Sequence, residues 1–91
     1  MSERIRRRVV VHGRVQGVFF RDSTDREARH RGLAGWVQNR DDGTVEAVFE
    51  GAPEDVRALL EFCGSGPHNA NVERTETHEE EPEGLSGFDV R

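Results

Sequence analysis

The sequence of 91 residues has a single cysteine, no lysine and no apolar run near the roughly 20 residues that span a bilayer. Because Cys63 has no second cysteine to pair with, an internal disulfide is excluded. The stretch from Met1 to Arg6 lacks the apolar segment of a secretory signal. These absences predict a protein of the reducing cytoplasm with no membrane-spanning segment.

The length of the chain fits one domain, residues 1–91, with a single modest core. Hydrophobic residues make up 33% of the sequence and charged residues 34%. This apolar content is low for a globular domain, but it includes enough Val, Leu and Phe to fold. We therefore expect a folded domain rather than a disordered chain, and a monomer is the default expectation.

Charge is distributed unevenly along the sequence. Residues 1–40 hold ten Arg against four acidic residues, whereas residues 41–91 hold three Arg against fourteen, and the formal net charge is -5. An acidic protein is unsuited to general nucleic-acid binding, which draws most of its affinity from cationic contacts with phosphates. The basic first half could still attract a small anion. An acidic chain whose basic residues are all Arg has two interpretations: adaptation to molar salt, or codon bias towards Arg.

Alternating side chains and turn signals predict the strands. Val9 and Val11 occupy every second position of a first strand, which therefore has one apolar face. The pair Asp42-Gly43 is a strong hairpin signal between two β-prone runs, and it predicts an antiparallel pair. Weaker alternation follows further along the chain. The predicted strands are residues 5–12, 34–39, 44–50 and 72–79, with a short terminal strand from Phe88 to Val90.

Charge order and apolar spacing predict two helices. The first covers residues 22–31, with acidic residues near the positive end of the helix dipole and basic residues near the negative end, and Gly32 supplies a stop. The second begins at Pro53, a residue suited to the first turn of a helix. The stripes expected to face the core are Phe20, Thr24 and Ala28 in the first helix, and Val56, Leu59, Leu60 and Cys63 in the second.

The order of these elements is β-α-β-β-α-β, followed by the short terminal strand. This order is that of the ferredoxin-like α/β sandwich. The predicted fold class is therefore α+β, an antiparallel sheet with two helices on one face. Such a fold hosts many unrelated activities, so function has to come from a site.

The connection between the first strand and the first helix, residues 13–21, carries a chemical signal. Gly13 and Gly17 permit backbone angles that other residues resist, so consecutive N–H groups could point into one concavity that suits an anion. The planar guanidinium of Arg21 can give a phosphate two parallel hydrogen bonds. The segment is not a Walker A loop, since no Gly-Lys-Ser/Thr follows. On these residues alone, a glycine-rich connection with a solvated Arg stays open as the alternative.

Three stretches become informative when they are read together. They are GRVQGVFFR at 13–21, GLAGWVQN at 32–39 and DGTVE at 42–46. Together they closely resemble the acylphosphatase family. The resemblance runs from about Arg8 to Val90 and includes the ending EPEGLSGF at 81–88, since family members likewise finish with a Gly-Phe strand. The fold that the resemblance implies is the same sandwich that the order of elements predicts.

The resemblance implies a hydrolase that cleaves the carboxyl–phosphate anhydride of a small acyl phosphate to a carboxylate and inorganic phosphate. It implies that Arg21 binds the phosphate directly and that Asn39 holds the attacking water. It implies no cofactor and no metal. The residues whose backbone amides are expected to hold the phosphoryl group are Gln16, Gly17, Val18, Phe19, Phe20 and Arg21.

The prominent side chains also have structural interpretations. Without the resemblance, Asn39 would be taken as a turn residue that bonds its own backbone. Trp36 is expected to pack in or beside the core. Asp22 would repel a phosphate if it pointed towards Arg21, and we expect it to point outward because successive helix positions diverge. The histidines show no ligand spacing and Cys63 lies on an apolar stripe, so no metal site is predicted.

Two rival functions remain at this point. One is a non-enzymatic accessory domain that binds phosphate, since acylphosphatase-like modules occur within larger proteins, although this chain carries no partner domains. The other is a sandwich that stacks nucleic-acid bases on sheet aromatics, which the acidic charge disfavours. Thr75 and Thr77 stand where family members often carry apolar residues, so we expect the fourth strand to pack less tightly.

Overall fold

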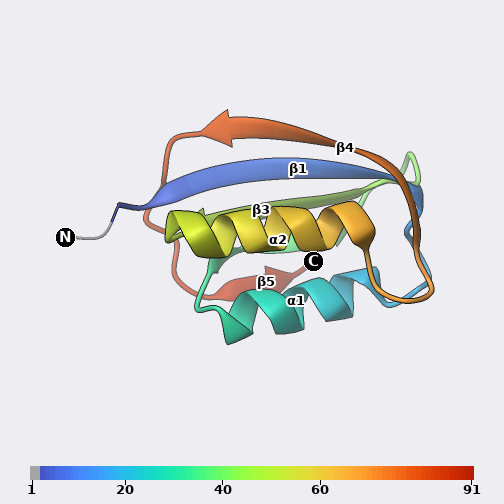
Figure 1. Cartoon of the computed structure of the whole chain (residues 1–91), viewed down its shortest axis with the longest axis horizontal. Helices are drawn as coiled ribbons and strands as arrows, with labels where there is room; N and C mark the ends of the chain where they lie inside the picture. The colour runs from blue at the N-terminus through green and yellow to red at the C-terminus, as the bar shows by residue number, and fades with distance from the viewer. Residues whose placement is uncertain (1–2) are drawn as a thin grey trace.

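The chain forms a five-stranded sheet with two helices on one of its faces (Figure 1). The computed structural model describes residues 3–91. Every predicted strand and helix is present in the predicted order. The elements are β1 (Ile5–Arg14), α1 (Phe20–His30), β2 (Ala34–Asn39), β3 (Val45–Gly51), α2 (Pro53–Ser65), β4 (Asn71–Glu80) and β5 (Phe88–Val90).

The strands lie in the order β4-β1-β3-β2-β5. β1 pairs with β3 and with β4, and β2 pairs with β3, all antiparallel as predicted. β5 differs, because it pairs with β2 in parallel and makes the sheet mixed. The connection over residues 81–87 crosses one end of the sheet from the β4 edge to the opposite edge (Figure 1). The terminal strand therefore starts at the end of the sheet where β2 also starts.

The end of β1 is the main departure from the predicted boundaries. The strand continues to Arg14, and its register against β4 shifts between His12 and Gly13. Gly13 has φ 128°, and a Cβ there would lie 2.2 Å from the carbonyl oxygen of Asn71. Gly13 is thus a β-bulge residue in close contact with the neighbouring strand, and its assignment to the anion-binding loop is wrong.

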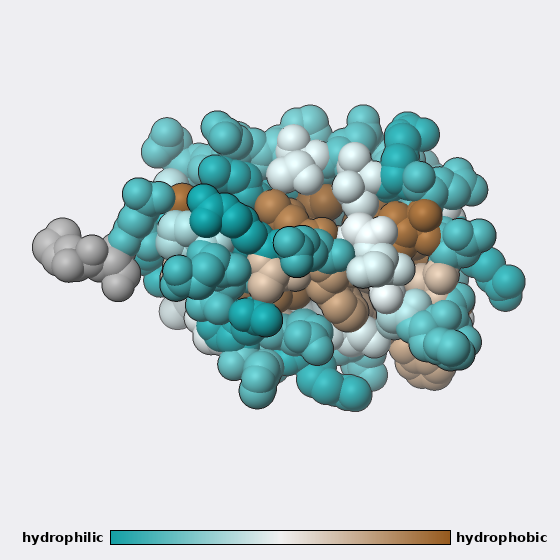
Figure 2. Space-filling view, in the orientation of Figure 1, coloured by the Kyte–Doolittle hydropathy of each residue, from teal (hydrophilic) through white to brown (hydrophobic). Residues whose placement is uncertain are grey.

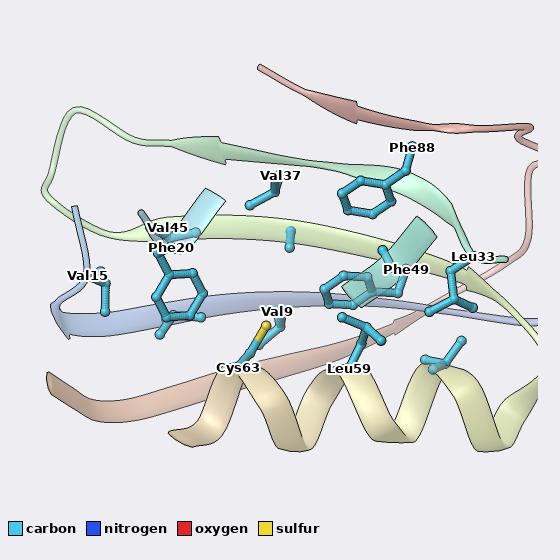
Figure 3. Packing of buried hydrophobic residues seen from close by; sticks show 14 of the residues in the cluster. Val9, Val15, Phe20, Leu33, Val37, Val45, Phe49, Leu59, Cys63 and Phe88 are labelled. Atoms are coloured by element: carbon cyan, nitrogen blue, oxygen red, sulfur yellow. The ribbon is translucent and has the colours of Figure 1, made fainter. Parts of the chain in front are cut away.

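The core lies between the helices and the sheet (Figure 3). Phe49 and Phe88 stack there with ring centroids 5.9 Å apart, and Phe20 approaches Phe62 at 6.3 Å. The predicted helical stripes are buried, except that Leu60 is only partly so. Between its hydrophilic side chains, the helix-bearing surface shows hydrophobic atoms in a few places (Figure 2). Each helix thus buries one narrow face, as the sequence predicts.

The opposite face of the sheet is not simply polar. Val10 is buried there together with Val48, although alternation placed Val10 on the polar side of β1. Trp36 lies half-buried on the same face, with the Arg91 guanidinium 4.6 Å from its ring centroid. Trp36 therefore does not pack in or beside the main core, where the sequence led us to expect it, but lies on the opposite face near Val48.

β4 contributes almost nothing to the main core. Thr75 and Thr77 are exposed, consistent with the looser packing expected for this strand. Ion pairs supplement its backbone pairing with β1: the Arg6 Nε lies 2.9 Å from Glu80 Oε1 and the Arg8 Nε lies 2.9 Å from Glu80 Oε2. One carboxylate thus joins two positions of β1 to the end of β4, and these bonds hold the pKa of Glu80 below its usual value.

A buried carboxylate fixes the connection that leads to β5. Glu50, at 0% exposure, accepts the backbone N–H groups of Glu83 at 2.6 Å and Leu85 at 2.7 Å. Arg4 and Arg6 approach it at 3.5 and 3.7 Å. Burial alone would raise the pKa of Glu50, but the two N–H bonds and the two guanidinium groups hold it below its usual value. The connection that places β5 in the sheet is therefore held by one ionised side chain.

Candidate active site

The loop between β1 and α1 is held from inside by apolar side chains. Val15, Val18 and Phe20 are buried, whereas Gly17 and Phe19 between them are exposed. The two exposed residues have positive φ, 75° at Gly17 and 62° at Phe19. The loop is thus anchored to the core by three buried side chains, and the residues between them are exposed to solvent. These anchors fix the loop without a ligand.

The loop leads directly into the first turn of α1. Phe19 is the N-cap, and the first helical hydrogen bond runs from the Ser23 N–H to the Phe19 carbonyl at 3.0 Å. The N–H groups at the start of a helix have no partner within the helix, and the helix dipole adds partial positive charge there. An anion at this position would meet several donors at once.

Arg21 lies in this first turn. Its Nη1 donates to the carbonyl oxygen of Arg91 at 2.8 Å, so the residue after β5 restrains the guanidinium. Within residues 3–91 its other N–H groups have no hydrogen-bond partner. A guanidinium has five N–H donors, so it can keep this restraint and still bind an anion with two of them.

Asn39 is the last residue of β2, where the β2–β3 hairpin begins. The side chain that caps this turn is Asp42, whose Oδ1 accepts from the Thr44 N–H at 3.0 Å and from the Thr44 hydroxyl at 2.6 Å. In the described part of the chain, the Asn39 side chain makes no hydrogen bond. The backbone-capping role that the sequence left open for Asn39 thus belongs to Asp42.

Gln16 connects the loop to the same hairpin. Its Nε2 donates to the carbonyl oxygens of Arg40 at 2.7 Å and Thr44 at 2.9 Å. The resemblance assigns the backbone amide of Gln16 to the phosphate site, and its side chain ties the loop to the hairpin that follows Asn39. Nothing in the residue pattern indicated this contact, because the partners are backbone atoms 24 and 28 positions away.

These elements enclose one cleft of about 430 Å³ at the end of the sheet where β1 leaves it and α1 begins (right side of Figure 1). The structure brings Arg21 and Asn39 together in it. Gln16 and Val18 are not among its lining residues, whereas Asp22 is both exposed and a lining residue. The lining residues are Val15, Gly17, Phe19, Phe20, Arg21, Asp22, Asn39 and Val90.

The predicted site omitted Val15, Asp22 and Val90, and of these Val90 lies farthest along the chain from the loop. β5 runs parallel to β2, with Val90 paired to Val37, so its end lies beside the end of β2 at Asn39. The terminal strand was predicted, but its parallel pairing was not. Only that pairing would have indicated that the end of the chain helps to form the cleft.

Comparison with known proteins decides the family. The sequence profile of the acylphosphatase family matches residues 7–90. The chain belongs to the acylphosphatase family. The acylphosphatase of Haloarcula marismortui is 54% identical over 86 residues and covers 94% of each chain, and that of Thermococcus kodakarensis is 56% identical over 88 residues and covers 97% of each. The structure of an acylphosphatase from Coxiella burnetii superposes with a TM-score of 0.92 at 39% identity, covering 97% of this chain and 93% of that one.

These matches confirm the predicted family, enzyme class and ferredoxin-like fold. The acylphosphatases of the two archaea have nearly the length of this chain, which disfavours the accessory-domain rival. Relatives from halophilic archaea fit the first interpretation of the acidic, Arg-only composition. Within residues 3–91, no helix is long and apolar enough to cross a membrane.

Proposed function

We propose that this acylphosphatase hydrolyses acyl phosphates at phosphorus, with the phosphoryl group held by the loop and Arg21 and the attacking water positioned by Asn39. One observation carries the proposal: a single cleft joins a preformed loop, the start of α1, Arg21 and Asn39. Phosphoryl transfer depends mainly on positioning and charge stabilisation, and this cleft can supply both.

The phosphoryl group binds at the start of α1. The loop amides from Gln16 to Arg21, among which those of Gly17, Phe19, Phe20 and Arg21 belong to residues that line the cleft, act with the free donors of the Arg21 guanidinium on its oxygens. Charge spreads over these oxygens in the transition state, so fixed N–H dipoles and one guanidinium stabilise it more than the ground state. Because Val15, Val18 and Phe20 anchor the loop in the core, little reorganisation is needed during the reaction.

Asn39 orients the water. A side-chain amide has both a donor and an acceptor and does not ionise, so it can hold a water in line with the bond that breaks. The Gln16 side chain, bonded to Arg40 and Thr44, keeps this amide at a fixed spacing from the loop. A second hollow shares Asn39 and is otherwise lined by Arg8, Gln38, Arg40, Asp41, Asp42 and Glu46. It includes no residue of the 15–21 loop, so it lacks this arrangement.

The chemistry of the leaving group requires little else. Water oxygen attacks phosphorus, the bond from phosphorus to the acyl oxygen breaks, and that oxygen leaves with the electron pair as a carboxylate. The corresponding acid has a pKa of about 4, so no general acid is needed to protonate it. One proton of the water passes to a phosphate oxygen of the substrate itself. With a leaving group this good, amide dipoles and one guanidinium suffice without a metal ion.

The Arg21→Lys variant tests the phosphate-binding part of the proposal. It keeps the positive charge but loses the planar pair of donors, so we expect kcat/KM to fall by about 10- to 100-fold and inorganic phosphate to inhibit more weakly. Steady-state kinetics with phosphate as a competitive inhibitor measures both effects. If kcat/KM and inhibition by phosphate equal those of the unmodified enzyme, Arg21 does not bind the phosphate.

We also propose that the enzyme acts on small molecules rather than nucleic acid, as a monomer in the cytoplasm. The acidic net charge supports the first point. The others stay predictions from the sequence.

A further inference from the structure

Two exposed hydrophobic side chains stand at the mouth of the cleft. Phe19 is 74% exposed and Val90 46%, and among residues 3–91 they are the large hydrophobic side chains that remain exposed. Isolated apolar side chains on a surface are ordinary, but these two come from distant parts of the chain and line the same cleft. Hydrophobic atoms are also visible on the surface near the start of α1 (Figure 2).

The backbone at Phe19 adds a second, independent observation. Phe19 has φ 62° and ψ 24°, the left-handed region that bulky residues rarely occupy and that glycine or asparagine adopts more readily. Its neighbours Val18 and Phe20 turn inward and are buried, so this conformation directs the Phe19 ring out towards solvent. Phe19 thus exposes its aromatic ring while its backbone has a conformation that is unfavourable for a bulky residue. Such strained conformations are typical of functional sites.

The position of the ring relative to the phosphate site suggests its use. Phe19 is the N-cap of α1, the point where the proposed phosphate-binding amides begin, and Arg21 follows two residues later. The acyl carbon of an acyl phosphate is separated from phosphorus by one oxygen. With the phosphoryl group bound at the helix start, the acyl group must therefore lie at the cleft mouth.

We propose that Phe19 and Val90 form an apolar site for the acyl group, and that the enzyme prefers acyl phosphates with an uncharged aromatic or bulky aliphatic acyl group. The inference rests on the proposed function. Asp22, an exposed residue, lines the same cleft, and a carboxylate there would repel an acyl group that carries a second negative charge. The preferred substrate is thus apolar at one end and dianionic at the other.

The test compares benzoyl phosphate with acetyl phosphate in four proteins: the unmodified enzyme, Phe19→Asn, Val90→Ala and the control Leu60→Ala. Asparagine tolerates the left-handed conformation, so Phe19→Asn removes the ring with the least disturbance of the loop. The quantity compared is the ratio of kcat/KM for benzoyl phosphate to that for acetyl phosphate, in which any shared loss at the phosphate site cancels.

We expect Phe19→Asn to lower this ratio by about three- to tenfold, the range of one aromatic contact, and Val90→Ala to lower it by about twofold. Leu60→Ala, half-buried on α2 away from the cleft, should leave the ratio unchanged. If Phe19→Asn lowers both rates equally, Phe19 serves only the loop conformation and the proposal is overturned.

A binding measurement separates this proposal from the proposed function. Phenylphosphonate and methylphosphonate cannot be hydrolysed, so calorimetry compares their affinities even in a protein without activity. Tighter binding of phenylphosphonate that Phe19→Asn abolishes would support the apolar site. Equal affinities for both phosphonates would overturn it. Failure of the unmodified enzyme to hydrolyse either acyl phosphate would instead contradict the proposed function.

Discussion

Replacing Glu50 with glutamine tests whether one buried carboxylate holds the connection to β5. The glutamine side chain keeps the shape, but only its oxygen can accept a hydrogen bond. It can therefore satisfy one of the two N–H groups, from Glu83 or Leu85, that Glu50 binds at 2.6 and 2.7 Å. The charge that offsets Arg6, whose side chain is 8% exposed, is also lost.

The expected size of the effect follows from these contacts. Loss of one partner of a buried charge pair destabilises a protein by about 3 to 5 kcal/mol. The lower end applies here, because Arg6 keeps its contacts with Glu80 and Glu83 and Arg4 is half-exposed. We therefore expect the free energy of unfolding of Glu50→Gln to fall by about 3 kcal/mol at pH 7, and the melting temperature by about 12 to 24 °C.

The effect has a defined pH dependence. Because the pKa of Glu50 is lower in the folded protein than in the unfolded chain, its contribution is complete above about pH 4.3 and is lost as the pH falls through the folded-state pKa. Urea unfolding of both proteins between pH 7 and pH 3 measures this. Glu81→Gln, an exposed change in the same connection, is the control and should lie within about 0.5 kcal/mol. Two results would refute the reasoning: a free energy of unfolding for Glu50→Gln within about 1 kcal/mol of the unmodified protein at pH 7, or a difference between the two proteins that does not change as the pH falls.

Two further predictions concern residues around the cleft and core. Gln16→Ala removes two hydrogen bonds to the hairpin, so we expect the free energy of unfolding in urea to fall by about 1 to 2 kcal/mol. Turnover should also slow, while inorganic phosphate still inhibits. Unchanged turnover would mean that the spacing between the loop and Asn39 does not depend on Gln16. Burial raises the pKa of Cys63 to about 12, so iodoacetamide at pH 8 should label the thiol only after unfolding in urea, and rapid labelling of the native protein would contradict its place in the core.

The sequence predicted those features of the fold that depend on residues close together in the chain. The alternation around Val9 and the stripe through Val56 and Leu59 identified core residues, because burial of one face imposes a period on the sequence. The Asp42-Gly43 signal located the hairpin that follows Asn39. Arg21 and Asn39 could be proposed as partners only through the resemblance to a family, since they lie 18 positions apart and no spacing rule links them.

Contacts between distant segments of the chain could not be predicted from the sequence. The parallel pairing of β5 depends on a connection that crosses the end of the sheet and is fixed by Glu50. In the sequence, nothing distinguishes Glu50 from an ordinary charged residue at the end of a strand. The restraint of Arg21 by the carbonyl of Arg91 depends in turn on that pairing. Gly13 was misplaced for the same reason, because only the neighbouring strand shows that it forms a bulge.

The central claim is that this cleft hydrolyses acyl phosphates with its own residues. The most direct measurement is hydrolysis of benzoyl phosphate by the purified protein in the presence of a chelator, compared with Asn39→Ala. We predict that the chelator leaves the rate unchanged, and that Asn39→Ala lowers kcat by about 100-fold or more while inorganic phosphate still binds. Full activity in Asn39→Ala, or loss of activity with the chelator, would contradict the account.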